Sequence, residues 1–159
     1  MATSIKNLSD YDKNKISNGA DYKIGIVVSE WNDQITEALL NGALKTLSEN
    51  GVQDKNLTVK YVPGAFELPL GAQSLLEQQK LDGILTIGTV IQGETKHFDF
   101  VCNGATQGIM QVMLNYNTPI SFCVLTDNNI QQSVDRSGGK HGNKGIECAV
   151  SLLKMIQLQ

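Results

Sequence analysis

The sequence has few cysteines, and their spacing suggests neither a disulfide nor a zinc site. Cys102, Cys123 and Cys148 are the three cysteines among 159 residues, and they lie far apart without a C-x-x-C motif. A disulfide framework needs an even number of cysteines, and a structural zinc site needs closely spaced ones. We therefore expect three buried thiols, no metal site and a reducing, cytoplasmic location.

The sequence also lacks a large excess of one charge and long apolar runs. The chain has 13 Lys and Arg against 16 Asp and Glu, a formal net charge of -3, and no block of like charges. This balance argues against binding to nucleic acid or to anionic membranes through counterion release. No apolar run approaches the ~18 residues of a membrane span. Residues 1–21 are polar and lack the apolar centre of a secretory signal.

Apolar residues make up 41% of the chain, which is enough for one domain with a buried core. Short apolar runs predict strands at residues 23–28, 57–62, 83–90 and 120–125. Apolar residues at helical spacing predict helices at residues 32–50, 65–79, 98–116, 128–136 and 143–156. Turn-forming residues dominate residues 1–21, so we expect an N-terminal arm before a single domain of residues 22–159.

Strands and helices alternate along the chain, which predicts a parallel sheet with helices on both faces. Ligands bind such sheets beyond the carboxyl ends of the strands. The candidate functional residues are therefore those that follow the strands, at residues 29–32, 63–67, 91–97 and 126–128.

Two of these segments offer groups for a planar, hydroxylated ligand. Trp31, the single tryptophan, can stack on a ring or can pack the first helix onto the sheet, and its position favours neither. Residues 63–67 form a tight turn that runs into a helix, whose first N–H groups are free for a polar ligand. Glu67 can bind that ligand, or it can serve only to stabilise the helix through the favourable interaction of its charge with the positive end of the helix dipole.

A third segment offers an anion site. Residues 88–95 nearly match the P-loop spacing, but Glu94 replaces the lysine and argues against a nucleotide triphosphatase. A turn at Gly93 can still direct backbone N–H groups at one phosphate, and the Thr95 hydroxyl adds a donor. His97 follows directly, and imidazole is well matched to proton transfer near neutral pH.

Two other residues are ambiguous on their own. Arg136 can bind phosphate through two parallel hydrogen bonds, or it can end a solvated helix. Phe122 lies within the fourth predicted strand, where core packing is the simplest interpretation.

Together these segments resemble the lumazine synthase (6,7-dimethyl-8-ribityllumazine synthase) family. The resemblance covers residues 23–155, and the order and spacing of its short motifs make it specific. The motifs are residues 24–28 with 31–32, residues 62–67, residues 88–91 with 93, 95 and 97–99, and residues 142–145.

The resemblance implies a flavodoxin-like, three-layer α/β/α sandwich with a four-stranded parallel sheet. It also implies a transferase of riboflavin biosynthesis that needs no cofactor. That enzyme condenses 5-amino-6-(D-ribitylamino)uracil with 3,4-dihydroxy-2-butanone 4-phosphate and releases the lumazine, phosphate and water.

The resemblance also implies a role for each matching residue. His97 would transfer protons, and Trp31 would stack on the pyrimidine. The residues assigned to the pyrimidine and ribityl chain are Trp31, Ala65, Phe66, Glu67, Thr89, Val90, Ile91 and Phe122, the last from a neighbouring subunit. The residues assigned to the phosphate are Glu94, Thr95 and Arg136, and those near a subunit boundary are Lys144 and Glu147.

A homo-oligomer is a further implication of the resemblance. Family members form pentamers with sites between subunits, and the arm of residues 1–21 would add a strand to a neighbour's sheet. The compact segment 137–142 resembles that of members that assemble twelve pentamers into an icosahedral shell. Riboflavin synthase is the protein partner that the resemblance suggests.

The chain departs from the family pattern at two positions of the expected phosphate site. Gln92 stands where the family often has a basic residue, and Glu94 puts an acid beside the phosphate, so we expect its side chain to point outward.

Three alternatives stay open. A non-catalytic flavin- or pterin-binding protein would keep Trp31 without needing His97. A shell-forming relative without activity would not need Glu67 or Arg136. Riboflavin synthase activity, which a distant relative of this fold has, is the third.

Overall fold

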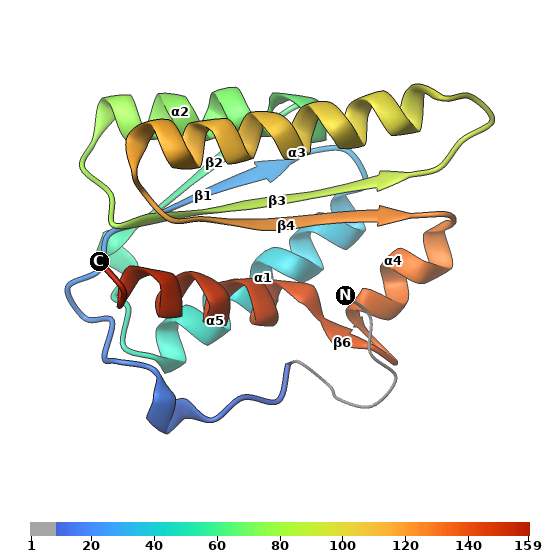
Figure 1. The fold of residues 1–159 in the computed structure, drawn as a ribbon. Coiled ribbons are helices and arrows are strands. Elements are labelled where there is room, and N and C mark those ends of the chain that lie inside the picture. Colours follow the sequence, from blue (N-terminus) through green and yellow to red (C-terminus); the bar gives the residue numbers. More distant parts are fainter. Residues whose placement is uncertain (1–8) are drawn as a thin grey trace.

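Four parallel strands form the centre of the structure, a computed structural model that describes residues 9–159 (Figure 1). They are β1 (Ile24–Ser29), β2 (Leu57–Val62), β3 (Gly83–Ile91) and β4 (Ile120–Asp127). Their order in the sheet is β2-β1-β3-β4, so β2 and β4 are the edges. The predicted four-stranded parallel sheet is confirmed.

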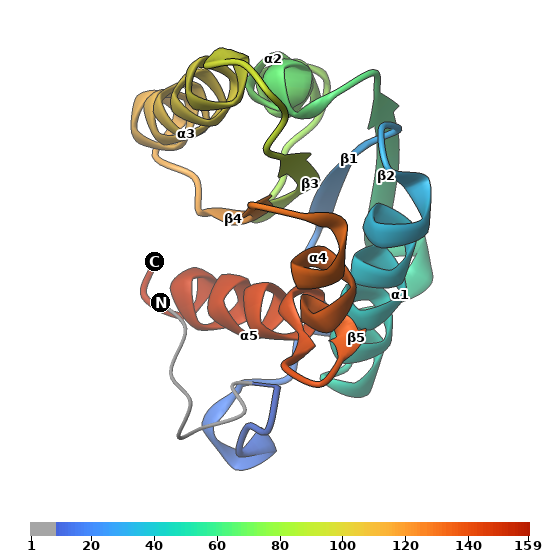
Figure 2. The same cartoon turned by 90° about the vertical axis from the view of Figure 1, so that its right-hand side faces the viewer.

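Helices cover both faces of this sheet and complete the predicted three-layer sandwich. Helices α2 (Leu68–Gln78) and α3 (His97–Tyr116) lie on one face, and α1 (Asp33–Glu49) and α5 (Lys144–Ile156) lie on the other (Figures 1 and 2). The short helix α4 (Ile130–Arg136) follows the end of β4. Within residues 9–159 there are also three single turns of 3-10 helix, η1 (Lys13–Lys15), η2 (Asp54–Asn56) and η3 (Ala65–Glu67).

The register of the strands aligns their carboxyl ends. Ser29 pairs with Val62, and Ile91 pairs with Asp127 at the ends of their ladders. All segments that follow the strands therefore leave the sheet at the same edge, as the alternating pattern predicts.

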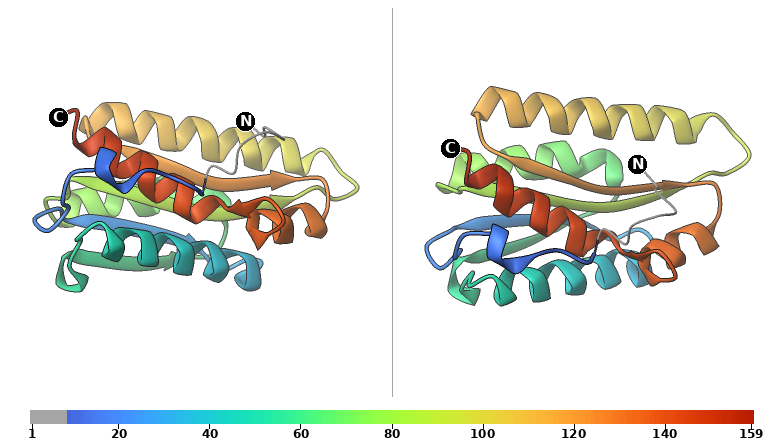
Figure 3. Two further views of the ribbon diagram at one scale, coloured as in Figure 1. Left: turned by 90° about the horizontal axis from the view of Figure 1, so that it is seen from below. Right: turned by 60° about the horizontal axis from the view of Figure 1, so that its bottom comes forward.

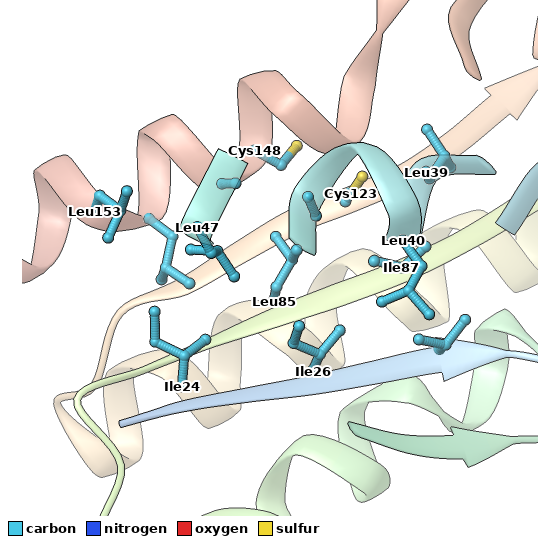
Figure 4. Close-up of a cluster of buried hydrophobic side chains, with 14 of the residues drawn as sticks. Ile24, Ile26, Leu39, Leu40, Leu47, Leu85, Ile87, Cys123, Cys148 and Leu153 are labelled. Atoms are coloured by element: carbon cyan, nitrogen blue, oxygen red, sulfur yellow. The ribbon is translucent and has the colours of Figure 1, made fainter. Parts of the chain in front are cut away.

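The core is divided by the sheet into two clusters of buried apolar side chains. Every residue of β1 is buried, because both of its faces are covered. Ile26 points into the larger cluster beneath α1 and α5, which Figure 4 shows, and Val27 points into the cluster beneath α2 and α3. This two-sided burial explains the unbroken apolar run in the sequence.

A short hairpin precedes α5, where the sequence indicates only a glycine-rich break. It consists of β5 (Ser137–Gly139) and β6 (Gly142–Asn143), which pair antiparallel. Asn143 then caps α5, because its side chain accepts a hydrogen bond from the Gly145 N–H at 2.8 Å and donates to the Ala38 carbonyl at 2.9 Å. Gly145 is required here, because an added Cβ would collide with the Leu39 carbonyl oxygen.

The described part of the N-terminal arm, residues 9–21, runs along the α1 and α5 layer of its own chain (Figure 3). Asn50 donates a hydrogen bond to the Tyr11 hydroxyl at 2.8 Å, and Lys13 forms an ion pair with Glu49 at 3.1 Å. Residues 1–8 of the predicted arm lie outside the described residues. Packing of the arm on a neighbouring subunit stays a prediction.

The thiols differ from the sequence-based expectation at one position. Cys123 and Cys148 are buried and free, but Cys102 is only partly buried, so the prediction of three buried thiols is wrong there. The buried residues of α3 are Ala105, Ile109 and Val112, and Cys102 lies beside that stripe. No helix within residues 9–159 has the length and apolar character needed to cross a membrane.

Candidate active site

The candidate site lies at the carboxyl edge of the sheet, which Figure 2 views end-on. We divide it into two halves. The ring half comprises Trp31, Gly64, Phe66 and Glu67, which follow β1 and β2. The anion half comprises residues 92–96, which follow β3, Asp127, which is the last residue of β4, and Arg136, which ends α4.

Trp31 is held by its backbone and leaves its side chain free. Its N–H donates to the Pro63 carbonyl at 3.2 Å, which extends the pairing of β1 and β2 by a short distance. The side chain is 72% exposed. An indole this exposed does not pack α1 onto the sheet, and its face is free to stack on a planar ligand.

Gly64 leaves room between the indole and a carboxylate. A Cβ added at Gly64 would lie 3.1 Å from Glu67 Oε2 and 3.8 Å from Trp31 Cδ1. The backbone of Gly64 therefore lies between an aromatic edge and a charged acceptor. This pairing suits a ligand that is planar at one end and carries hydroxyl groups at the other.

Phe66 adds a second exposed aromatic ring. Its side chain is 58% exposed and rests against α3 at Gly104, where an added Cβ would lie 2.6 Å from Phe66 Cε2. Ala65 is buried beneath it and begins η3. Because the first N–H groups of a helical turn lack intrahelical acceptors, the backbone of Ala65 and Phe66 can bind a polar ligand.

The anion half begins with the loop that extends beyond β3 (Figure 1). The Gln92 N–H donates to the Asp127 carbonyl at 2.9 Å, and the His97 N–H donates to Thr95 Oγ1 at 3.3 Å. Glu94 is exposed, and within residues 9–159 an added Cβ at Gly93 would meet nothing within 4 Å. An open turn of this kind can present backbone N–H groups to an anion.

His97 is the first residue of α3, and it is exposed. It therefore joins the anion loop to the rest of α3, the helix whose Gly104 faces the Phe66 ring. This position connects the two halves of the site through one rigid element.

Arg136 brings a guanidinium to the anion half, and the buried carboxylate of Asp127 holds it. Arg136 Nε lies 3.7 Å from Asp127 Oδ1, and the two side chains are 33% and 8% exposed. The Ser133 hydroxyl donates to Asp127 Oδ2 at 2.8 Å and lies 3.3 Å from Thr89 Oγ1. Thr89 thus directs its hydroxyl to Ser133 and not to the surface, whereas Val90 and Ile91 end β3 only half-buried.

The sequence places Asp127 in a candidate segment but assigns it no role, and it does not single out Ser133. The position of Asp127 at the end of a predicted strand is a usable signal, because it falls in the segment 126–128. Ser133 gives no such signal, since a serine among polar residues of a short helix is indistinguishable from a solvated one.

The structure does not bring Phe122 to this site within one chain. Phe122 pairs with Thr86 and lies five residues before Asp127 on the edge strand β4, which is about 16 Å along the strand. It lines an apolar groove of about 200 Å³ together with Met113 and Met155.

Lys144 and Glu147 lie in the first turn of α5, the helix whose Cys148 contacts the Phe122 carbonyl. Lys144 Nζ lies 2.7 Å from Glu147 Oε2, and Cys148 Sγ donates to the Phe122 carbonyl at 3.5 Å. Burial alone would lower the pKa of Lys144, but the hydrogen bond to Glu147 and nearby negative charge raise it above its ordinary value.

A thiol pair belongs to the same region (Figure 4). The hydrogen bond from Cys123 and the Lys144 charge lower the pKa of Cys148, although its burial opposes this shift. The hydrogen bond with Cys148 and burial raise the pKa of Cys123. Within residues 9–159, no group of three His, Cys, Asp or Glu side chains could hold a metal ion.

The fold and the site together define a class of protein. A flavodoxin-like sandwich with exposed aromatic rings in one half of its site and a guanidinium held by a buried carboxylate in the other is suited to binding a planar ring in the first half and a phosphate in the second.

Comparisons with known proteins agree with this class. The family described as 6,7-dimethyl-8-ribityllumazine synthase matches residues 21–159. Proteins of that name from Flavobacterium johnsoniae and Christiangramia forsetii are each 56% identical to this chain over its full length, which covers 84% and 95% of their own lengths. The protein of that name from Parabacteroides distasonis is 51% identical over 98% of both chains. The chain belongs to the 6,7-dimethyl-8-ribityllumazine synthase family.

Proposed function

We propose that this chain is a transferase of riboflavin biosynthesis. It condenses 5-amino-6-(D-ribitylamino)uracil with 3,4-dihydroxy-2-butanone 4-phosphate to give 6,7-dimethyl-8-ribityllumazine, phosphate and water. The observation that carries the proposal is the identity of 56% to relatives named for this activity, over the full length of the chain. The two halves of the site support it independently, since one suits a pyrimidine with a polyol chain and the other a phosphate.

The ring half binds the pyrimidine substrate in this proposal. Trp31 stacks on the ring, and its exposure leaves a face free for that contact. The backbone of Ala65 and Phe66 and the carboxylate of Glu67 hold the ribityl hydroxyls. Val90, Ile91 and the neighbouring Thr89 form the end of β3 at the uracil edge, and the first two act through their backbone.

The anion half binds the phosphate of the second substrate. The amides of Glu94 and Thr95 supply N–H donors, and Arg136 supplies a guanidinium. His97 moves protons during imine formation and phosphate elimination, because an imidazole exchanges protons readily near neutral pH. Holding two flexible substrates side by side supplies a large share of the rate gain.

The active form is an oligomer in this proposal, with sites between adjacent subunits of a pentamer. Exposed apolar side chains along α3, among them Phe100 and Leu114, support a further interface on that helix. Phe122 then completes a neighbour's site, Lys144 and Glu147 lie near that boundary, and the arm packs on the neighbour. Twelve pentamers form a shell, riboflavin synthase is a partner, and the location is cytoplasmic.

The direct test mixes the purified chain with both substrates and follows lumazine fluorescence together with phosphate release. The proposal expects both products in equal amounts. Binding of the pyrimidine without turnover would instead establish the non-catalytic alternative, and conversion of the lumazine to riboflavin would establish riboflavin synthase activity. Sedimentation of the same sample reports the size of the assembly, and a monomer with full activity would contradict a site shared between subunits.

A further inference from the structure

We propose that Asp127 is a positioning residue that assembles the anion half of the site. Its backbone holds the anion loop, and its side chain holds Arg136. The inference rests on the proposed function, because the anion is taken to be the phosphate of the four-carbon substrate.

The backbone of Asp127 fixes the start of the loop. Asp127 is the last residue of β4 and pairs with Ile91, the last residue of β3. Its carbonyl accepts the hydrogen bond from the Gln92 N–H at 2.9 Å. The first peptide of the anion loop is therefore tied to the residue whose side chain contacts the arginine.

The carboxylate of Asp127 is buried and has a defined partner on each oxygen. Oδ2 accepts from the Ser133 hydroxyl at 2.8 Å, and Oδ1 lies 3.7 Å from Arg136 Nε. Ser133 is itself fully buried, and its hydroxyl also forms a hydrogen bond with the Thr89 hydroxyl on β3. A carboxylate with 8% exposure needs such compensation, because burying an unpaired charge is costly. The pair is therefore a built feature and not a surface ion pair.

This arrangement leaves part of the guanidinium free. The contact of Asp127 is with Nε of Arg136. In this proposal the two terminal nitrogens bind two oxygens of one phosphate. An arginine that is already oriented loses less conformational freedom when the phosphate binds. An anion at the terminal nitrogens also has the guanidinium between itself and the carboxylate. We therefore expect orientation to outweigh the repulsion between the carboxylate and the phosphate, so that removal of the carboxylate weakens phosphate binding.

The test compares Asp127→Asn with Asp135→Asn in the full, assembled protein. Both substitutions remove one negative charge close to Arg136, but Asp135 pairs with Lys140 at 3.5 Å and not with the arginine. Inorganic phosphate is the binding probe, measured by calorimetry, and steady-state kinetics give KM for each substrate. Melting curves check that both variants fold.

We expect Asp127→Asn to weaken phosphate binding and to raise KM for the butanone phosphate by about tenfold, the size of one lost charge-assisted contact. KM for the pyrimidine and kcat at saturation should change by less than about twofold, because the other half of the site is untouched. Asp135→Asn should leave all of these quantities unchanged. Unchanged or tighter phosphate binding in Asp127→Asn would overturn the inference.

A second set of variants keeps the test decisive. In an Arg136→Ala background, Asp127→Asn should weaken phosphate binding by less than about twofold, since the residue acts through the arginine. An equally large loss in that background would overturn the positioning role. If Asp127→Asn does not fold, Ser133→Ala replaces it, with an expected loss of about threefold because the carboxylate keeps its charge. A wild-type chain that binds phosphate but makes no lumazine would refute the proposed function alone, because calorimetry still reports on Asp127.

Discussion

The two halves of the candidate site are prepared for their ligands in different ways. In the ring half, Trp31 and Phe66 are largely exposed, and glycines shape the space around them. In the anion half, Asp127 is buried and contacts the buried Ser133, whose hydroxyl in turn lies beside that of the buried Thr89 on β3. The ring half is thus shaped by glycines, which have no side chain, and the anion half by a network of buried polar side chains.

The difference follows from what each ligand group requires. Stacking tolerates a shift of the ring, because dispersion and apolar contact change gradually with position. A bidentate contact with phosphate depends on direction, so the guanidinium must be oriented beforehand. Substitutions should therefore act mainly on the pyrimidine in one half and mainly on the phosphate in the other.

The largest effect is expected for His97, which connects the two halves. His97→Ala should lower kcat by about a hundredfold or more, because the proton-transfer group is lost. KM for both substrates should change by less than about threefold. His141→Ala is the matched control, since His141 is an exposed histidine in the hairpin turn. Steady-state kinetics of lumazine formation decide the matter, and similar kcat values in both variants would contradict the assignment.

Arg136→Ala should have the next largest effect and should act on the anion half alone. We expect KM for the butanone phosphate to rise by about fiftyfold, because two charge-assisted hydrogen bonds are lost together. KM for the pyrimidine should stay the same. Lys140→Ala removes an equal charge from an exposed position nearby and should have little effect. An equal rise in both KM values would mean that the two halves are not independent.

The fold was predictable because its signals are local and repeated. The apolar run of β1 reflects burial on both of its faces. The alternation of strands and helices indicates that the strands of the sheet are parallel. The candidate site segments follow from the same rule, since Trp31, Glu67 and His97 all lie in the segments that lead from the end of a strand to the first residue of the next α-helix.

The rest depends on contacts between elements distant in the sequence. Ser133 contacts Asp127 only because α4 folds back on β4. Gly104 contributes to the ring half only because the Phe66 side chain, which comes from η3, packs against α3 at that position. The hairpin of residues 137–143 is too short to show a strand pattern. The partial exposure of Cys102 depends on how far α3 is rotated about its axis.

Trp31 tests the ring half with a moderate effect. Trp31→Ala should raise KM for the pyrimidine by about tenfold, since one stacking contact is lost. Trp31→Phe should restore affinity to within about threefold, because a flat aromatic face remains. Phosphate affinity, measured by calorimetry with inorganic phosphate, should be the same in both variants. A loss of phosphate binding in Trp31→Ala would contradict the division of the site.

The smallest effect is expected for Gly104, where the ring half depends on an absent side chain. An alanine Cβ at this position would lie 2.6 Å from Phe66 Cε2, and the exposed Phe66 ring can turn away from it. Alanine also favours a helix interior by about 0.5–1 kcal/mol over glycine, so the melting temperature should hold or rise slightly. KM for the pyrimidine should nevertheless rise by about threefold, because the displaced ring no longer lies beside the ribityl site. Asn103→Ala, on the exposed side of the same helix, is the control. A lower melting temperature with an unchanged KM would show that Gly104 serves packing alone.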